Sequence, residues 1–342
     1  MFKYFLPILL IVLLTACGSA ANSPLAVATA QPVPTTETLA PTSAALEHIN
    51  LGVGYIPNVQ FAPFYVAQSK GFYTAEGLEV DLEYGLENDF VTLTAQGERD
   101  FAVASGDQVI LARAQDLPVV YVMKWYERFP VGVMALAETG IDTPEKLNGH
   151  SVGIPGLFGA SYVGWQALVY AAKLDPAKIN LEQIGFTQAE AIIQKKVDAA
   201  VIYVANEPVQ LTRLGYQVDV IQVSDYIDLV SNGLITNEKV IQEKPDLVRR
   251  LVQATLRGLE YTIAHPDEAF AIVRQSVREI TDKDAPTQRA VLDASIKLWR
   301  SDQPGISDPT AWATSVKFMQ ETGLIQAPVN VDTLYTNEFV TK

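Results

Sequence analysis

Cysteine is almost absent from this chain, whose 342 residues include only Cys17. A single cysteine excludes both an intramolecular disulfide framework and a zinc site built from cysteine ligands. Histidine is nearly as scarce, and the sequence has no G-x-S-x-G, P-loop or H-E-x-x-H spacing. The sequence therefore offers no catalytic residue, metal site or cofactor motif, and we expect a protein that is not an enzyme.

Positive charge is also scarce, because 25 Lys and Arg stand against 39 Asp and Glu, for a net charge of −14. An acidic surface repels phosphate backbones, so nucleic acid is not an expected partner. It also gives the folded part no polybasic attraction to anionic lipid. Hydrophobic residues make up 49% of the chain, which is ample for the core of one large or two medium domains.

The apolar run at 5–14 follows Lys3 and is about half of the roughly 20 residues that span a bilayer. These features predict a signal peptide over 1–16. The next residues, Leu14-Thr15-Ala16-Cys17, resemble a bacterial lipobox, which implies cleavage before Cys17 and lipidation of its sulfur. The alternative is an ordinary secretory signal with a chance cysteine. We expect a protein anchored to the cell membrane on its extracytoplasmic face, through the lipid alone.

Residues 18–45 are rich in Ala, Thr, Pro, Ser and Gln and show neither a helical nor a strand period. Few of these residues offer apolar surface to bury, so a flexible tether is predicted, and its bounds are placed at 17–47. A tether of this kind lets a captured ligand be carried to a membrane partner.

Short apolar strands alternate with helices from Ile49 onward. A short helix is predicted at 143–147, with Thr143 as its cap and Pro144 in its first turn. This alternation indicates an α/β fold with mostly parallel sheets, followed by a helical carboxy-terminal part. The strands are predicted at 49–53, 79–84, 101–104, 119–123, 151–154, 199–203 and 234–236. The other helices are predicted at 64–70, 108–114, 164–174, 189–195, 246–264, 266–276, 288–299 and 310–322.

Four stretches, at 55–80, 153–162, 197–208 and 236–250, resemble the thiamine-precursor (NMT1/THI5-like) branch of the type II periplasmic binding proteins. The resemblance implies two α/β lobes that close on a ligand by a hinge motion. It places lobe 1 at 48–140 and 236–342, and lobe 2 at 141–235. It also implies a solute-binding lipoprotein whose partners are a small molecule, an ABC permease and its ATPase.

Ligands of open α/β sheets sit beyond the carboxyl ends of the strands, so the loops there hold the candidate ligand-binding residues. These loops combine aromatic faces, amides and carboxylates. The candidates are Tyr55, Asn58, Phe61, Ser105, Asp107, Trp125, Tyr126, Phe158, Tyr162, Asn206 and Glu207.

Several of these candidates have alternative interpretations. Ser105 and Asp107 equally fit a helix N-cap, and Trp125 with Tyr126 equally fits core packing. The alternative for the turn before Tyr162 is plain strand–helix turn chemistry, and the alternative for Glu207 is a solvated helix start.

The candidate residues lack the arginine cluster expected for phosphate, sulfate or dicarboxylate ligands, and favour a flat neutral heteroaromatic compound. Pyrimidine-binding members of the family typically carry Asp-Trp before a Pro-Asn pair and a His after it. Here those positions are Gly54, Tyr55 and Phe61, which favours a larger and more apolar ring system. Riboflavin fits best. The alternatives are a thiamine-precursor pyrimidine (formylaminopyrimidine or hydroxymethylpyrimidine) and ligand sensing without transport.

Overall fold

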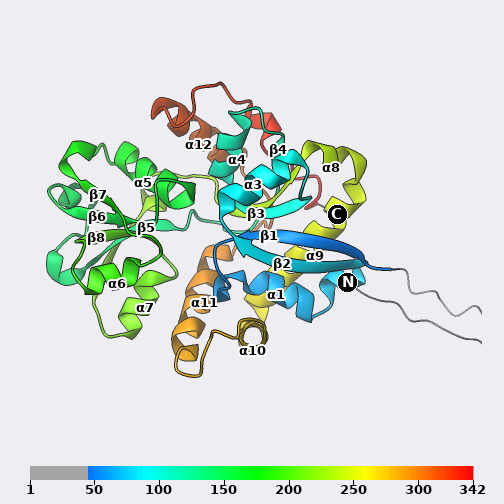
Figure 1. The fold of residues 1–342 in the computed structure, drawn as a ribbon, viewed down its shortest axis with the longest axis horizontal. Helices are drawn as coiled ribbons and strands as arrows, with labels where there is room; N and C mark the ends of the chain where they lie inside the picture. The colour runs from blue at the N-terminus through cyan, green and yellow to red at the C-terminus, as the bar shows by residue number, and fades with distance from the viewer. Residues whose placement is uncertain (1–44, 342) are drawn as a thin grey trace, which may run out of the picture. The chain divides into compact units, whose positions relative to one another are not determined.

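The computed structural model describes residues 45–341, and Figure 1 labels most of its helices and strands. In this range ten strands form two separate five-stranded sheets with helices packed against them. The predicted α/β fold class is confirmed. The predicted signal peptide at 1–16, the lipidation site at Cys17 and most of the tether at 17–47 lie outside the described residues.

Lobe 1 is the part built on the first sheet, whose strand order is β2-β1-β3-β10-β4. β1 runs parallel to β2 and β3, whereas β10 is antiparallel to both of its neighbours. β10 comes from a later part of the chain and pairs with β3, so Asn232 lies directly opposite Ser105. The strands are β1 (Glu47–Gly54), β2 (Leu78–Gly85), β3 (Phe101–Ser105), β4 (Val119–Lys124) and β10 (Asn232–Asn237).

Lobe 2 is built on the second sheet, which repeats this pattern in the order β7-β6-β8-β5-β9. β6 is parallel to β7 and β8, and β5 is antiparallel to β8 and β9. The strands are β5 (Val131–Leu136), β6 (Ser151–Ile154), β7 (Asn180–Gln183), β8 (Ala199–Tyr203) and β9 (Val218–Gln222).

The chain crosses to lobe 2 between β4 and β5 and returns between β9 and β10. The predicted lobe boundary at residue 140 leaves β5 in lobe 1, although β5 pairs only with strands of the second sheet. No strand was predicted over β5, because its run of apolar residues shows no alternation that would identify a partner. We therefore propose crossovers at 125–130 and 223–231.

Eight predicted helices are confirmed, with ends that differ by no more than a few residues. The short helix predicted at 143–147 is a 3₁₀ turn, Pro144–Leu147, and the Thr143 side chain does not cap it. The confirmed helices are α1 (Ala62–Ser69), α4 (Gly106–Arg113), α5 (Gly159–Ala171), α6 (Gln188–Ile193), α9 (Pro245–Ala264), α10 (Pro266–Ser276), α11 (Ala285–Trp299) and α12 (Pro309–Glu321).

Helix α3 (Glu87–Gln96) was missed by the sequence analysis, although it begins at the cleft described below. Its signals are the acidic residues Glu87 and Asp89 in its first turn and Gly97 at its end, with φ of 76°. Acidic residues favour the first turn of a helix, and glycine favours the left-handed conformation that ends one. Three further short helices were not predicted: α2 (Phe72–Ala75), α7 (Glu207–Arg213) and α8 (Glu238–Glu243).

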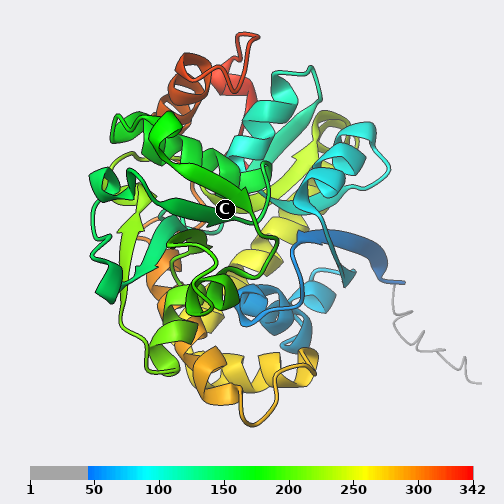
Figure 2. The ribbon, with the colours of Figure 1, turned by 60° about the vertical axis from the view of Figure 1, so that its left-hand side comes forward.

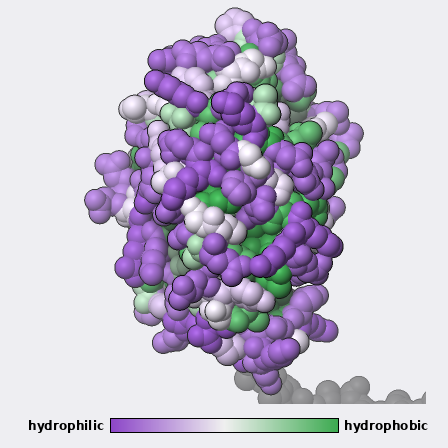
Figure 3. Space-filling view, turned by 90° about the vertical axis from the view of Figure 1, so that its left-hand side faces the viewer, coloured by the Kyte–Doolittle hydropathy of each residue, from purple (hydrophilic) through white to green (hydrophobic). Residues whose placement is uncertain are grey.

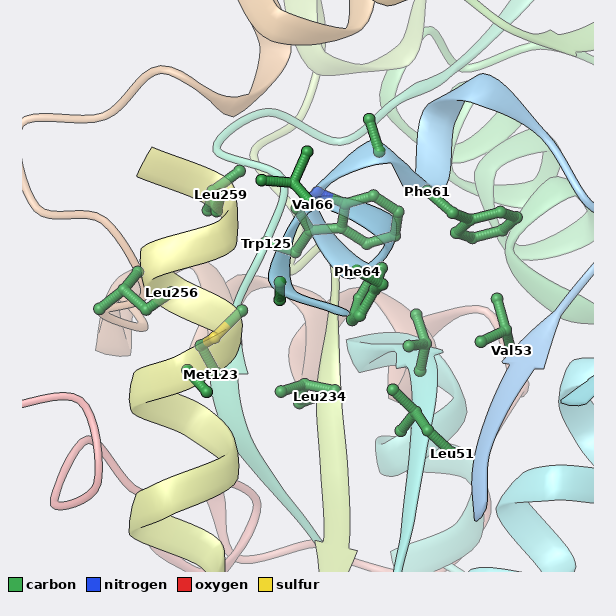
Figure 4. Close-up of a cluster of buried hydrophobic side chains, with 14 of the residues drawn as sticks. Leu51, Val53, Phe61, Phe64, Val66, Met123, Trp125, Leu234, Leu256 and Leu259 are labelled. Carbon is green, nitrogen blue, oxygen red and sulfur yellow. The ribbon is translucent and has the colours of Figure 1, made fainter. Parts of the chain in front are cut away.

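The strands bury alternate residues on opposite faces, as the period of two requires. On β5, Val131 and Val133 pack in one cluster while Met134 and Leu136 pack in another. The first of these clusters also includes Tyr121 of β4, so a continuous core joins the two sheets. Figure 4 shows part of the cluster on the other face of lobe 1, where side chains of α1 and α9 gather around Trp125.

No helix within residues 45–341 combines the length and the hydropathy needed to cross a membrane.

Candidate functional site

Loops at the carboxyl ends of strands from both sheets line one cleft. Tyr55 follows β1, Glu87 follows β2 and Trp125 follows β4 on one side, and Phe158 and Asn206 follow β6 and β8 on the other. Figure 2 shows the segment after β1 (blue) approaching the green segments of lobe 2. The cleft encloses about 980 Å³, counting the part open to solvent.

Seven of the predicted binding residues line this cleft. They come from both lobes. Contact between each of them and a ligand remains a prediction. The seven are Tyr55, Phe61, Trp125, Tyr126, Phe158, Asn206 and Glu207.

The other four predicted residues do not line the cleft. The Asn58 side chain accepts a hydrogen bond from the Gln60 amide at 2.9 Å and caps a 3₁₀ turn. Ser105 is the buried last residue of β3, and Asp107 is buried beside it in the first turn of α4. Tyr162 packs against the core that joins the two sheets. Asn58, Ser105 and Asp107 thus position neighbouring residues instead of facing the cleft.

Tyr55 has a backbone conformation that few residues adopt, with φ of 123°. Its amide donates to the carbonyl of Gly85 at 2.8 Å, which holds this conformation in place. Its ring meets the edge of Phe186 from lobe 2, with the ring centroids 5.1 Å apart. Burial raises the pKa of the Tyr55 hydroxyl to about 12. Backbone strain in a non-glycine residue concentrates at functional sites, and here it positions an aromatic ring between the lobes.

The cleft also has exposed aromatic side chains on lobe 2, where Phe158 and Phe186 are 47% and 52% exposed. Leu86 on lobe 1 lines the cleft and is similarly exposed. Figure 3 shows hydrophobic side chains at the surface of an otherwise mostly hydrophilic face of the molecule. We call Tyr55, Phe158 and Phe186 the aromatic rim of the cleft.

Trp125 and Tyr126 belong mainly to the core of lobe 1, so the core-packing interpretation of this pair is the better one. Trp125 is 3% exposed and packs between Phe64, at a centroid distance of 5.1 Å, and Trp299, at 5.7 Å. Tyr126 meets Trp299 edge-on. Both residues still line the cleft, but their ring faces are largely covered by neighbours of their own lobe.

Glu87 lines the cleft and was not predicted as a site residue. The residue is partly exposed, but one carboxyl oxygen reaches the buried end of β3. There Oε1 accepts from the Ser105 amide at 2.5 Å and from the Ser105 hydroxyl at 2.8 Å. Desolvation, reinforced by the nearby charge of Asp107, raises the pKa of Glu87 to about 7. A carboxyl group of this kind donates or accepts hydrogen bonds near neutral pH.

Glu207 is the first residue of α7 and is 7% exposed, so it is not a solvated helix start. Its carboxylate accepts from the Tyr203 amide at 3.0 Å and from the Asn206 side chain at 2.8 Å. Burial raises its pKa to about 7. These two donors use part of the accepting capacity of the carboxylate and leave further lone pairs for a ligand.

The cleft has no basic side chain among the described residues that line it; its charged residues are Glu87 and Glu207. No group of three or more His, Cys, Asp or Glu within residues 45–341 is arranged to hold a metal ion. An anionic ligand would therefore meet carboxyl groups without a counter-charge, whereas a neutral aromatic ligand would meet rings and hydrogen-bonding groups.

Several other cleft residues were missed by the sequence analysis, among them Gln60, Phe186, Tyr203 and Asn232. Phe186 follows β7, a short polar strand with no apolar alternation in its sequence. Asn232 begins the antiparallel strand β10, so its amino end lies at the edge where the parallel strands have their carboxyl ends. Because an antiparallel strand begins at this edge, the residues just before the predicted strand at 234–236 could have been predicted to line the cleft.

Comparisons with known proteins agree with this geometry. A family model described as NMT1/THI5 like matches residues 58–269. The chain is 41% identical to "Riboflavin-binding protein RibY" of Chloroflexus aurantiacus, over 98% of this chain and 96% of that protein. It is 29% identical to the "Formylaminopyrimidine-binding protein" of Halalkalibacterium halodurans, over 86% of this chain and 91% of that protein. It is 24% identical to "4-amino-5-hydroxymethyl-2-methylpyrimidine phosphate synthase" of Legionella pneumophila, over 87% and 94%.

Two solved structures are similar in fold. The periplasmic aliphatic sulphonate binding protein SsuA of Escherichia coli has a TM-score of 0.67 at 15% identity, over 84% of this chain and 91% of that chain. A Candida albicans protein described as having the generic periplasmic binding protein fold has a TM-score of 0.63 at 15% identity, over 85% and 97%. At this identity the likeness shows the fold, and the predicted two-lobe type II periplasmic-binding-protein fold is confirmed.

Proposed function

This chain belongs to the NMT1/THI5-like family, and we propose that it captures riboflavin outside the cytoplasm for an ABC importer. The observation that carries the proposal is a cleft between two lobes that is lined by aromatic rings and carries no basic side chain among the described residues. Such a site suits a flat, uncharged heteroaromatic compound. The similarity to a riboflavin-binding protein over nearly the whole chain supports the same ligand.

The positions where this chain departs from pyrimidine-binding relatives also support a larger ring. Tyr55 and Phe61 line the cleft at two of the three positions, and Gly54 lines it at the third. Phe61 packs on Trp125 at a centroid distance of 5.7 Å. Two aromatic rings at these positions increase the apolar surface available to a ligand.

A thiamine-precursor pyrimidine is the second candidate ligand. It is supported by the relative that binds formylaminopyrimidine and by the buried carboxyl group of Glu207 in the cleft. A carboxylate pairs well with the amino and ring nitrogen groups of an aminopyrimidine.

We propose that binding is not followed by chemistry, although one relative is named a synthase. Each of the three histidines is away from the cleft. His48 lies beside Glu79 and His150 beside Asp198, both on the surface, and His265 packs against Tyr261. Native mass spectrometry of the protein purified from rich medium should recover a bound ligand of unchanged mass. A ligand that is chemically altered during incubation would contradict the proposal.

Attachment to the membrane through a lipid on Cys17 is part of the proposal. The Cys17→Ala variant should move from the membrane fraction to the soluble fraction, because the acidic folded part has no other attraction to lipid. Fractionation followed by immunoblotting measures this, and a variant that stays in the membrane fraction would refute lipid anchoring at this residue. A permease and an ATPase encoded beside the gene would support transport, whereas a sensor kinase there would support sensing.

Titration of the purified protein with riboflavin tests the ligand directly. We expect one ligand per chain and quenched flavin emission, because stacking on aromatic side chains quenches flavins. Hydroxymethylpyrimidine and formylaminopyrimidine serve as competitors in the same titration. A protein that ignores riboflavin and binds either pyrimidine would reverse the ranking of the two ligands.

A further inference from the structure

The cleft has a less exposed part that differs chemically from the aromatic rim. Phe158 and Phe186 of the rim are about half exposed, whereas this part combines polar groups with the buried rings of Trp125 and Tyr126. There the Asn232 amide donates to the Tyr203 hydroxyl at 3.5 Å, and Glu87 accepts both donors of Ser105. Glu87 and Asn232 belong to lobe 1 and Tyr203 to lobe 2, so both lobes contribute to this part. We call Glu87, Tyr203 and Asn232 the polar floor.

Some hydrogen-bond acceptors in and behind the polar floor have no partner. The Oδ1 atom of Asn232 is buried and has no partner among the described residues, and the same is true of Oδ1 of Asp107 behind the floor. The second oxygen of Glu87 makes no hydrogen bond within residues 45–341 and faces Gly159 of lobe 2. Buried acceptors without partners are costly and uncommon, so a bound molecule with hydroxyl or N–H donors would satisfy them.

We propose that the polar floor binds the hydroxyl groups of the ligand's sugar-alcohol chain while the aromatic rim holds its ring system. This inference rests on the proposed function and specifies which part of the cleft each end of riboflavin occupies. A hydroxyl group both donates and accepts, so it matches the Glu87 carboxyl, the Asn232 amide oxygen and the Tyr203 hydroxyl. A ring nitrogen or methyl group offers a poorer match to three such groups.

The packing of the less exposed aromatic residues supports the same orientation. Trp125 is 3% exposed and packs against Phe64 and Trp299, so little of its ring is open to a ligand. The rim residues Phe158 and Phe186 are about half exposed, so part of each ring is open to a ligand. A three-ring system therefore finds apolar surface at the rim and a flexible polyhydroxy chain finds partners at the polar floor.

Lumiflavin, which carries a methyl group in place of the sugar-alcohol chain, separates the two ends of the ligand. We expect the wild-type protein to bind riboflavin about tenfold or more tightly than lumiflavin, as one or two buried hydrogen bonds provide. In the Glu87→Ala variant this preference should fall to about threefold or less, while the affinity for lumiflavin stays within about twofold of wild type. Fluorescence titration measures both ligands on the same preparation.

The control is Asp89→Ala, which removes a carboxylate from the same turn of α3 but outside the residues that line the cleft. It should retain the full preference for riboflavin. Thermal unfolding checks that Glu87→Ala is folded, since that change also removes the acceptor for Ser105. Asn232→Ala tests the polar floor independently and should also lower the preference for riboflavin over lumiflavin.

Equal wild-type affinity for riboflavin and lumiflavin would overturn the inference and leave the proposed function intact. A preference that survives in both Glu87→Ala and Asn232→Ala would also overturn it. Binding of neither flavin would instead refute the proposed function.

Discussion

Flavin mononucleotide should bind this protein at least about 100-fold more weakly than riboflavin, a difference of about 2.7 kcal/mol. The two compounds differ by one phosphate, which carries a charge of about −1.5 to −2 at neutral pH. No Lys, Arg or His lines the described cleft, and Glu87 and Glu207 do. A buried phosphate would therefore lose its hydration without gaining a counter-charge. Parallel fluorescence titrations of the two flavins at one salt concentration measure the ratio.

A matched variant identifies the source of this discrimination. Glu87→Gln keeps the size of the side chain and removes its charge, so it should reduce the difference in affinity between riboflavin and flavin mononucleotide. Asp89→Asn, on the same helix but outside the cleft, should leave this difference in affinity unchanged. Equal binding of both flavins by the wild-type protein would show that the phosphate stays in solvent or finds a cation, and would contradict the placement of the hydroxyl chain at the polar floor.

Removing the two exposed rings of the rim together, as Phe158→Ala with Phe186→Ala, should weaken riboflavin binding by about 30-fold or more. Each base-like ring that stacks on an aromatic side chain gains roughly 1–3 kcal/mol. Both side chains are about half exposed in the described structure, so their truncation should cost little folding stability. Isothermal titration calorimetry gives the affinity, and thermal unfolding confirms that the variant is folded.

Tyr226→Ala provides the comparison for this pair, because Tyr226 is an exposed aromatic residue (43%) that does not line the cleft. Its affinity for riboflavin should equal that of the wild type. If the double variant also binds like the wild type, the rim does not hold the ring and the aromatic argument for this ligand is wrong.

Local patterns predicted most of the fold. The amphipathic carboxy-terminal helices and the apolar strands β3, β4, β6 and β8 appear within a few residues of their expected positions. Sequence patterns did not predict the elements whose position depends on long-range strand pairing. β5 is a short apolar run whose sheet is chosen by long-range pairing with β8 and β9, and this sets the lobe boundary. Local periodicity carries no information on such a choice.

The candidate site was predicted in part for a similar reason. Loops after predicted strands contained Tyr55, Phe158 and Glu207, and these line the cleft. Trp125 also lies there, but its ring is packed against Trp299 of α11, a contact between residues 174 positions apart. Glu87 was missed because the helix that carries it was missed. Placing such residues requires the tertiary packing that brings distant helices to one strand end.

The most direct test of the account is a crystal structure of the protein grown with riboflavin. We predict density for one flavin in the cleft, with its ring system in contact with the aromatic rim on both lobes and its hydroxyl chain at Glu87. An empty cleft with the flavin bound elsewhere, or a flavin held by one lobe alone, would contradict the claim that two lobes enclose an uncharged ring.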